Sequence, residues 1–339
     1  MRNFVFILFI CYTKLVVGQT NDSLITNKRN TPGVKMISVR KDKYVVFTQK
    51  INSGKNKLLL VPGGPGASFE YFEVFPTYLK DDYEIYYYSP LGSFLSDQPQ
   101  DSTLQRVDEY VEELEEVRQA LGLEHFFLLG HSWGGRLCLA YANKYQNNLK
   151  GLILSNATGL GKKMVEQNGQ VISDYDRYQQ QLIADIAETL PGMHHYGDSL
   201  RRCLITPVNQ PRLMDSIMKT IRPLFVRKHF LRLATPPEAV TRSRIHSTPE
   251  IKLHWLTEDT QKIDALSELG NITVPTLFIG AHYDYIRPNY EEARRAMKKA
   301  RNVTIYITPN GSHRPMWDDS ENYFAALKSF VAQVNQHNR

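Results

Sequence analysis

A serine lies between glycines at residues 130–135, in the order Gly-His-Ser-Trp-Gly-Gly. The preceding residues, 126–129, form a continuous apolar run typical of a buried strand, and an alanine-rich helical pattern follows through residue 145. A serine at such a strand-to-helix turn is the nucleophile-elbow pattern G-x-S-x-G, which exposes the hydroxyl above the sheet. The pattern makes Ser132 a candidate nucleophile, although an ordinary glycine-rich turn has the same spacing.

A serine hydroxyl is a poor nucleophile at neutral pH, so it needs a histidine base whose tautomer is fixed by a carboxylate. On an α/β sheet that carries this elbow, the partners follow in the order Ser, acid, His. Asp284 comes just after the apolar run 276–279, and His313 comes just after the run 303–307. Because active sites lie at the carboxyl ends of parallel strands, these two residues are the candidate acid and base.

Other residues compete for these roles. Asp284 could be an ordinary turn carboxylate, with His282 or Asp259 in the triad instead. His131 competes with His313 as the base, but its place inside the elbow favours a structural role. Asp284 and His313 are favoured because they occur in the required order and directly follow two successive predicted strands.

Two backbone segments could stabilise an oxyanion beside Ser132. The helix that begins at Trp133 directs free N–H groups and the positive end of its dipole toward the serine. The loop 62–66, Pro-Gly-Gly-Pro-Gly, follows the apolar run 57–61. Its glycines, which lack side chains, allow the backbone to pass close to another group.

Apolar and amphipathic runs alternate along most of the chain. After an antiparallel entry over 34–51, strands are expected at 57–61, 83–88, 126–129, 149–154, 276–279 and 303–307. Helices are expected at 71–79, 103–121, 133–145, 290–300 and 319–334. We expect Ser102 or Thr103 to cap the helix over 103–121 and Gly122 to end it. Strands alternating with helices predict a mostly parallel, doubly wound α/β sheet.

The alternation of strand and helix patterns stops between residues 158 and 269. This stretch is rich in Arg, Gln, His, Met and Pro, has helical patterns at 178–190 and 213–221, and has no clear buried strand. We interpret it as a helical lid inserted after the strand that follows the elbow helix. The predicted organisation is a signal peptide at 1–18, core segments at 34–157 and 270–337, and the lid at 158–269.

Composition narrows the possible partners. The 339 residues are 42% hydrophobic and 22% charged, with a net charge of +6 and a pI near 9.0, as in a soluble globular protein. The basic residues are scattered, which argues against a nucleic-acid partner. The cysteines, three in number, form no disulfide framework and have no zinc spacing, and we predict no metal or cofactor.

The first 18 residues have the order of a secretory leader. Arg2 is followed by an apolar run over 4–12 and by Val-Val-Gly at 16–18, although Lys14 weakens the pattern and an N-terminal strand or anchor is the alternative. We therefore expect a secreted or periplasmic protein with no stable membrane span after signal removal. The sequons for N-glycosylation begin at Asn21, Asn156, Asn271, Asn302 and Asn310.

Several motifs together resemble one family. They are Gly63-Gly64-Pro65-Gly66, Leu91-Gly92-Ser93 with Ser96-Asp97-Gln98-Pro99, Gly130-His131-Ser132-Trp133-Gly134-Gly135, Tyr283-Asp284, and Gly311-Ser312-His313 with Met316-Trp317-Asp318-Asp319. The chain thereby resembles the proline iminopeptidase family of α/β hydrolases, which are serine aminopeptidases. The resemblance implies an α/β-hydrolase fold, a triad of Ser132, Asp284 and His313, and an oxyanion hole made by the N–H groups of Gly64 and Trp133.

The chain departs from the family pattern in three places. Pro62 replaces the histidine that usually begins the oxyanion loop, so the loop must be held differently. Ser89 replaces an aspartate, and the lid stretch 246–264 is shortened and lacks an acidic motif. Lid glutamates bind the substrate amine in the family, and Glu238 is the residue that can be carried over here, with a lid surface charge as its alternative role.

These residues define three hypotheses. The first is a serine aminopeptidase acting on short peptides, with N-terminal proline among the candidate residues released. The second is an esterase or other small-acyl hydrolase with the same triad, because the lid sets the substrate while the sheet holds the triad. The third is a binding protein that kept the fold and lost turnover.

Overall fold

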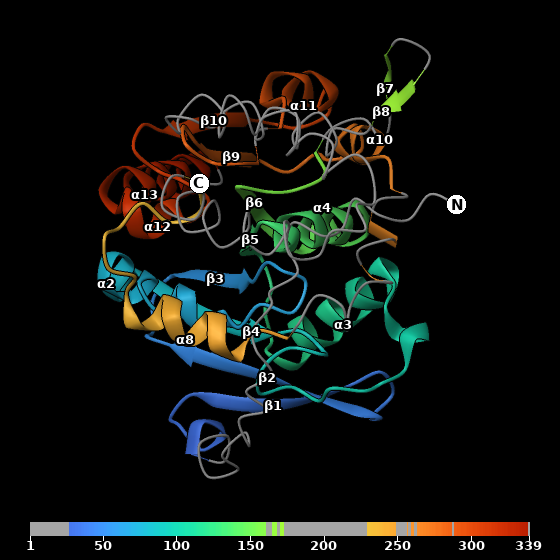
Figure 1. Ribbon diagram of the computed structural model, residues 1–339, viewed down its shortest axis with the longest axis vertical. Helices are drawn as coiled ribbons and strands as arrows, with labels where there is room; N and C mark the ends of the chain where they lie inside the picture. The colour runs from blue at the N-terminus through green and yellow to red at the C-terminus, as the bar shows by residue number, and fades with distance from the viewer. Residues whose placement is uncertain are drawn as a thin grey trace, which may run out of the picture.

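A computed structural model shows an α/β sandwich around one large sheet (Figure 1). The structure describes residues 27–160, 165–167, 170–172, 229–248, 256, 259–260, 263–286 and 288–337, and of Asp81, 165–167 and 170–172 it describes the backbone alone. The predicted leader at 1–18 and the predicted helices at 178–190 and 213–221 lie outside these residues, so they stay predictions.

The sheet has eight strands in the order β1-β2-β4-β3-β5-β6-β9-β10. Their bounds are β1 Val34–Val39, β2 Tyr44–Ile51, β3 Asn56–Val61, β4 Tyr83–Ser89, β5 Phe126–His131, β6 Leu149–Ser155, β9 Thr276–Ala281 and β10 Val303–Thr308. β1 and β2 pair antiparallel and β2 joins β4 antiparallel, whereas the pairs from β4 through β10 are parallel. The predicted doubly wound sheet with an antiparallel entry is confirmed, and the carboxyl ends of its parallel strands share one edge.

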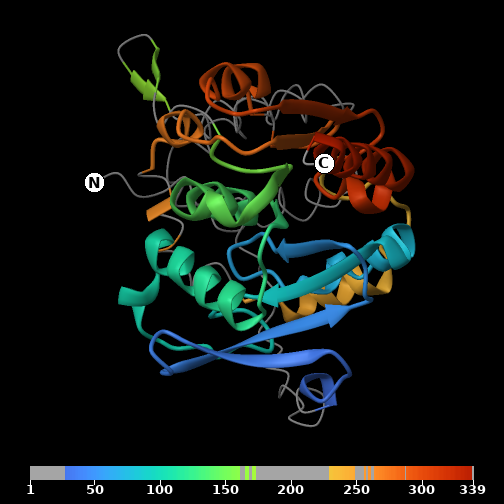
Figure 2. The same cartoon turned by 180° about the vertical axis from the view of Figure 1, so that it is seen from behind.

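Helices cover both faces of the sheet, as the two opposite views show (Figures 1 and 2). α3 (Val107–Ala120), α4 (Trp133–Tyr145), α10 (Ala265–Leu269) and α11 (Tyr290–Ala296) contribute to the core on one face. α2 (Phe75–Leu79), α13 (Ser320–His337) and α8 (Glu238–His246) contribute to the core on the other, and the short α12 (Pro315–Asp318) precedes α13. Each face thus buries one side of the strands, which explains their continuous apolar runs.

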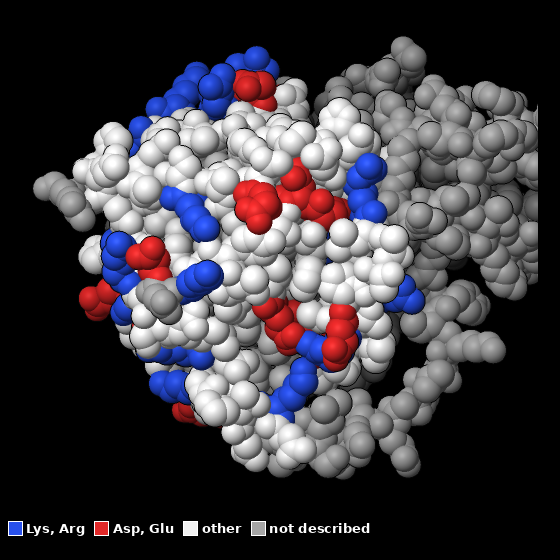
Figure 3. All heavy atoms as spheres, turned by 90° about the vertical axis from the view of Figure 1, so that its left-hand side faces the viewer, with Lys and Arg blue, Asp and Glu red and all other residues white. Residues whose placement is uncertain are grey.

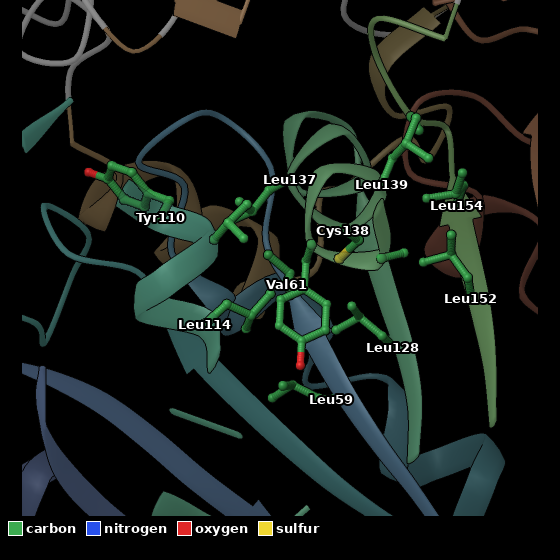
Figure 4. Close-up of a cluster of buried hydrophobic side chains, with 14 of the residues drawn as sticks. Leu59, Val61, Tyr110, Leu114, Leu128, Leu137, Cys138, Leu139, Leu152 and Leu154 are labelled. Atoms are coloured by element: carbon green, nitrogen blue, oxygen red, sulfur yellow. The ribbon is translucent and has the colours of Figure 1, made fainter. Parts of the chain in front are cut away.

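The elbow helix α4 packs directly on the central strands. Leu137 and Cys138 of α4 lie beside Leu128 of β5 and Val61 of β3 in one hydrophobic cluster, to which α3 also contributes side chains (Figure 4). A Cβ added at Gly134 would lie 2.3 Å from the carbonyl oxygen of Val61, so only glycine allows this approach of helix to strand. The close packing fixes the start of α4 relative to the sheet.

Two predicted helices differ from the observed ones. The pattern over 71–79 is divided into the 3-10 turn η2 (Phe69–Phe72) and α2, and the pattern over 103–121 begins with the 3-10 turn η4 (Ser102–Leu104) before α3 starts at Val107. The prediction that Ser102 or Thr103 caps this helix is wrong. Asp101 caps η4, and the N–H of Val107 donates to the carboxylate of Asp259 at 2.9 Å, a contact too distant in sequence for a local pattern to reveal.

A long insertion separates two neighbouring strands, because β6 and β9 pair although residues 156–275 lie between them. Its described parts include α8, α10 and an antiparallel hairpin, β7 (Val165–Gln167) with β8 (Gln170–Ile172). The sequence pattern predicted helices here and missed the hairpin, which lies at the periphery (Figures 1 and 2). The position of the insertion is that of the predicted lid.

A buried carboxylate fastens α8 to η2. The Glu70 side chain has no exposed surface and pairs with Lys28, with Arg242 and with the His246 ring nitrogen at 2.6 Å. The hydroxyl of Ser243 also donates to the carbonyl oxygen of Ser68 at 2.9 Å. Burial alone would raise the pKa of Glu70, but the hydrogen bonds from His246 and Lys28 outweigh it and lower the pKa to about 2.

This shift predicts an acid-sensitive contribution to stability. Because the folded pKa of Glu70 lies below its ordinary value of 4.5, the contribution is present above pH 4.5 and is lost as the pH falls through about 2. Glu70→Gln should therefore lower Tm by roughly 2–6 °C at pH 7, and the difference from wild type should vanish near pH 2. Thermal unfolding from pH 2 to 7 measures it. Glu291→Gln, in the exposed pair with Arg294, is the control that should change Tm little at any pH.

On the face drawn in Figure 3, acidic and basic residues lie close together in several small groups with uncharged residues between them. In the described part of the chain, no helix is long and apolar enough to cross a membrane. Within the same residues, no group of three or more His, Cys, Asp or Glu side chains is arranged to hold a metal ion. Cys138 is buried as a free thiol in the core, where burial raises its pKa.

Candidate active site

Ser132 occupies the sharp turn between β5 and α4. Its φ of 55° and ψ of −123° are strained values for a residue with a side chain, as expected of a nucleophile elbow. The Ser132 N–H donates to the carbonyl oxygen of Ser155 at 3.0 Å, and the Ser132 carbonyl accepts from Gly135 and Thr158. These bonds from neighbouring segments hold the strained turn in place.

The three predicted triad residues meet at the carboxyl edge of the sheet. His313 Nε2 lies 3.0 Å from Ser132 Oγ, and His313 Nδ1 lies 3.0 Å from Asp284 Oδ1. Asp284 follows β9 and His313 follows β10, as the chain order requires. All three are buried, with Ser132 7% exposed, so little water competes for these hydrogen bonds. The geometry allows proton transfer from the serine to a histidine oriented by the carboxylate.

Asn156 holds the carboxylate of Asp284. Its Nδ2 donates to Asp284 Oδ2 at 2.7 Å, while the N–H of Ile286 donates to Oδ1 at 2.9 Å. Sequence reasoning treated Asn156 as a glycosylation sequon, but the side chain is fully buried in the fold. The sequence signal that could have revealed this role is the position of Asn156 directly after β6, at the edge of the sheet where the triad residues lie.

The competing residues lie elsewhere or serve other contacts. His282 is exposed and its ring packs on Tyr283, and Asp259 binds the first N–H of α3. His131 is buried beside the triad, but its Nε2 lies 2.7 Å from the backbone carbonyl oxygen of His313 rather than from the serine.

The glycine loop passes directly over the nucleophile. A Cβ added at Gly63 would lie 2.8 Å from the Ser132 Cβ, and Gly64 has a φ of 114°. Among the described residues, no hydrogen bond occupies the N–H of Gly64 or of Trp133. Two free donors beside Ser132, one from the loop and one from the first residue of α4, fit an oxyanion hole.

Tyr71 supplies the support that Pro62 cannot. The N–H of Gly63 donates to the Tyr71 hydroxyl at 2.8 Å, and that hydroxyl lies 3.1 Å from His131 Nδ1. Because the His313 carbonyl can only accept, His131 carries its proton on Nε2 and receives the Tyr71 O–H on Nδ1. Burial and the neighbouring His313 lower the pKa of His131 well below its ordinary value, which keeps this ring neutral. The loop and the base are thus joined through Tyr71 and His131.

The other departure, Ser89, leaves a polar atom without a partner. Ser89 Oγ is buried and has no hydrogen-bond partner among the described residues, while the Ser89 carbonyl accepts from Ser96 Oγ at 2.6 Å. The structure gives Ser89 no contact with the triad that would explain the substitution.

Removing the Tyr71 hydroxyl should weaken turnover without removing the triad. Tyr71→Phe leaves the Gly63 N–H without its acceptor and the His131 ring without a donor, and a lost buried hydrogen bond costs about 1–3 kcal/mol. We expect kcat to fall about tenfold with a smaller change in KM. Steady-state kinetics measure the two parameters, and Tyr78→Phe, whose ring stacks on Phe324, is the matched control. An unchanged kcat would contradict the support of the loop by Tyr71.

Two aromatic rings, those of Tyr285 and Phe230, pack on His313. The ring centroid of Tyr285 lies 4.6 Å and that of Phe230 lies 5.4 Å from the imidazole. His229 anchors Phe230, since His229 Nδ1 bonds the Tyr283 carbonyl at 2.9 Å and the His229 carbonyl accepts from the His313 N–H at 2.9 Å. The insertion thus supplies an apolar ring beside the catalytic base, a contribution that sequence reasoning missed.

Glu238 lies at the start of α8. Its side chain is 85% exposed and pairs with Arg242 one turn later at 2.6 Å. The structure does not join it to Ser132, Asp284 or His313 by any described contact, so its role in amine binding stays a prediction.

Comparison with known proteins shows the family to which the chain belongs. The family model described as alpha/beta hydrolase fold matches residues 56–320, which defines the class of protein. The proline iminopeptidase of Flavobacterium johnsoniae is 34% identical over 292 residues, covering 83% of this chain and 91% of that protein. The proline iminopeptidase of Elizabethkingia meningoseptica is 33% identical over 306 residues, covering 86% of this chain and 95% of that protein. The chain therefore belongs to the proline iminopeptidase family of α/β hydrolases.

A solved structure shares the fold at lower sequence identity. The crystal structure of proline iminopeptidase from Mycobacterium smegmatis superimposes with a TM-score of 0.70 at 18% identity, over 90% of this chain and all of that one. The predicted family and the predicted fold class are both confirmed.

Proposed function

We propose that this protein is a serine aminopeptidase that releases N-terminal residues, proline among them, from short peptides. The observation that carries the proposal is the chain of contacts from Ser132 through His313 to Asp284, each 3.0 Å long. Membership of the proline iminopeptidase family supports the peptide substrate.

The geometry supports a two-step acyl transfer. Ser132 Oγ attacks the carbonyl carbon of the N-terminal residue while its proton passes to His313 Nε2, and Asp284 stabilises the resulting imidazolium. The N–H groups of Gly64 and Trp133 stabilise the oxyanion of the tetrahedral intermediate. His313 then gives the proton to the leaving amine, which leaves an acyl-enzyme on Ser132. Water, deprotonated by the same histidine, hydrolyses that ester and restores the serine.

The surroundings of the base fit an apolar N-terminal residue. The rings of Phe230 and Tyr285 both pack on His313, where the acylating residue must lie during transfer. A pyrrolidine ring can pack on such aromatic faces without leaving a polar group unpaired. This supports N-terminal proline as one of the residues released.

A substrate panel tests the proposal. Wild type should cleave proline-arylamide and free-amine prolyl peptides with much higher kcat/KM than the same peptides N-acetylated. If short acyl esters are turned over and all free-amine peptides resist, the esterase hypothesis replaces this one. Failure to turn over either class, together with no reaction with a fluorophosphonate, would favour a binding protein.

Glu238 is tested with the same panel. If it binds the substrate ammonium, Glu238→Gln should lower kcat/KM for free-amine peptides about tenfold to a hundredfold, because a charge-assisted hydrogen bond contributes roughly 1.5–3 kcal/mol. A neutral ester should change little. Equal effects on both substrates would indicate that the pair of Glu238 with Arg242 supports α8 instead.

Secretion belongs to the same proposal. The order of a basic residue, an apolar run and small residues over 1–18 supports removal of a leader in a secretory pathway. N-terminal sequencing of the protein recovered outside the cytoplasm should begin after Gly18, and a retained Met1 would contradict this.

A further inference from the structure

One buried cation next to the triad has no counterion among the residues that the structure describes. Arg314 follows His313 in the chain and is only 7% exposed. Its Nε is buried without a hydrogen-bond partner, and its guanidinium forms no ion pair with any described residue. The guanidinium carbon instead lies 4.9 Å from the ring centroid of Tyr71 and 4.7 Å from that of Phe230.

Other buried arginines of this protein are paired. Arg40 contacts the carboxylate of Glu113, and Arg136 contacts that of Glu268. Burying a charge without a partner is costly, and the attraction of two rings offsets only part of that cost. Burial lowers the pKa of Arg314 to about 10, so the side chain still carries its charge at neutral pH, and exposed Arg244 adds further positive potential.

Arg314 shares its neighbours with the triad and the glycine loop. The Phe230 ring lies against both the guanidinium and the imidazole of His313, and the Tyr71 ring lies against the guanidinium while its hydroxyl accepts from the Gly63 N–H. His313 protonates the leaving amine, so the part of the peptide that follows the scissile bond must extend past this histidine. One residue spans at most about 3.6 Å, which places the end of a dipeptide or tripeptide about 4–8 Å beyond that bond.

We propose that Arg314 binds the C-terminal carboxylate of a short peptide substrate and so makes the enzyme selective for free-acid dipeptides and tripeptides. This inference rests on the proposed aminopeptidase function. A guanidinium presents paired donors that match the two oxygens of a carboxylate, and Tyr71 and Phe230 hold its plane in position. Substrate binding would supply the counterion that the described fold lacks.

The test compares peptides that differ only at the C-terminus. For wild type, kcat/KM for prolyl-alanine should exceed that for prolyl-alanine amide about tenfold to a hundredfold, the range expected for a charge-assisted hydrogen bond. Arg314→Met, which keeps the length of the side chain and removes the charge, should bring the acid-to-amide ratio close to one. Arg314→Lys should restore part of the preference, and Arg294→Met, on the exposed face of α11, should keep the wild-type ratio.

Two results would overturn the inference. One is an acid-to-amide ratio near one in wild type. The other is a ratio that stays high in Arg314→Met, which would mean that Arg314 only supports the loop of His313.

A second readout does not depend on aminopeptidase activity. Glycylglycine should slow the labelling of Ser132 by a fluorophosphonate in wild type and not in Arg314→Met, whereas glycylglycine amide should protect neither. If wild type cleaves no aminoacyl substrate yet shows this protection, the proposed function fails and the carboxylate site stands. Without protection of wild type by the acid, the carboxylate site fails whatever the enzyme cleaves.

Discussion

Ser132→Ala should abolish hydrolysis while the protein stays folded. The variant removes the oxygen that lies 3.0 Å from His313 Nε2, so no acyl-enzyme can form on this residue. In a triad that acts as a unit, loss of the nucleophile costs roughly 10⁶-fold in kcat, with a residual rate from the oxyanion hole. Single-turnover kinetics with proline-arylamide and labelling with a fluorophosphonate measure the loss.

The control for this variant is a serine at the start of another helix. Ser320→Ala removes the hydroxyl that bonds the Met316 carbonyl at the start of α13, outside the triad. It should keep its labelling and its kcat within about twofold, as expected of a change away from the reacting groups. Ser132→Ala should unfold at the wild-type Tm. Stoichiometric labelling of Ser132→Ala would show that another residue is the nucleophile.

Asp284→Asn should reduce kcat about 10⁴-fold, the cost of fixing the wrong histidine tautomer. The carboxylate accepts from His313 Nδ1, from the Ile286 N–H and from Asn156 Nδ2, so three donors converge on it. An amide offers one oxygen in place of two, and its NH₂ must face one of those donors. With the NH₂ toward His313, the imidazole carries its proton on Nε2 and cannot accept the proton of Ser132.

Asp259→Asn is the matched control for the acid. Asp259 competed for the triad on sequence grounds, but in the fold it accepts the N–H of Val107. Asparagine also caps helices well, so this variant should keep kcat within about twofold. The pH dependence of kcat/KM separates the two variants further. Similar losses in both would indicate that Asp284 is not the triad acid.

The candidate nucleophile and the succession of strands along the chain could be predicted because both are local or periodic features. Ser132 is marked by five consecutive residues, and Asp284 and His313 by their places directly after apolar runs. Parallel strands place residues that follow them at one edge of the sheet, so the order of the triad residues in the sequence predicted that they lie close together in space.

The supporting contacts could not be predicted, because each joins segments far apart in the chain. Tyr71 reaches His131, and Asp259 reaches Val107, through pairings that no periodicity specifies. Arg314 could have been noticed, since it adjoins His313, but the sequence does not show that no carboxylate of the described residues pairs with it. Burial and partners decide such roles, and both depend on tertiary packing.

The burial of Asn156 has a consequence for biosynthesis in a eukaryotic host. Oligosaccharide transfer acts on the N-x-Ser/Thr sequence of the nascent chain, before this side chain is enclosed beside Asp284. A glycan attached at that moment could not be accommodated in the fold and would remove the donor that holds the carboxylate. Thr158 contributes its backbone N–H to the Ser132 carbonyl, which alanine would also provide. For production in yeast or mammalian cells, Thr158→Ala therefore erases the acceptor sequence and keeps Asn156 itself.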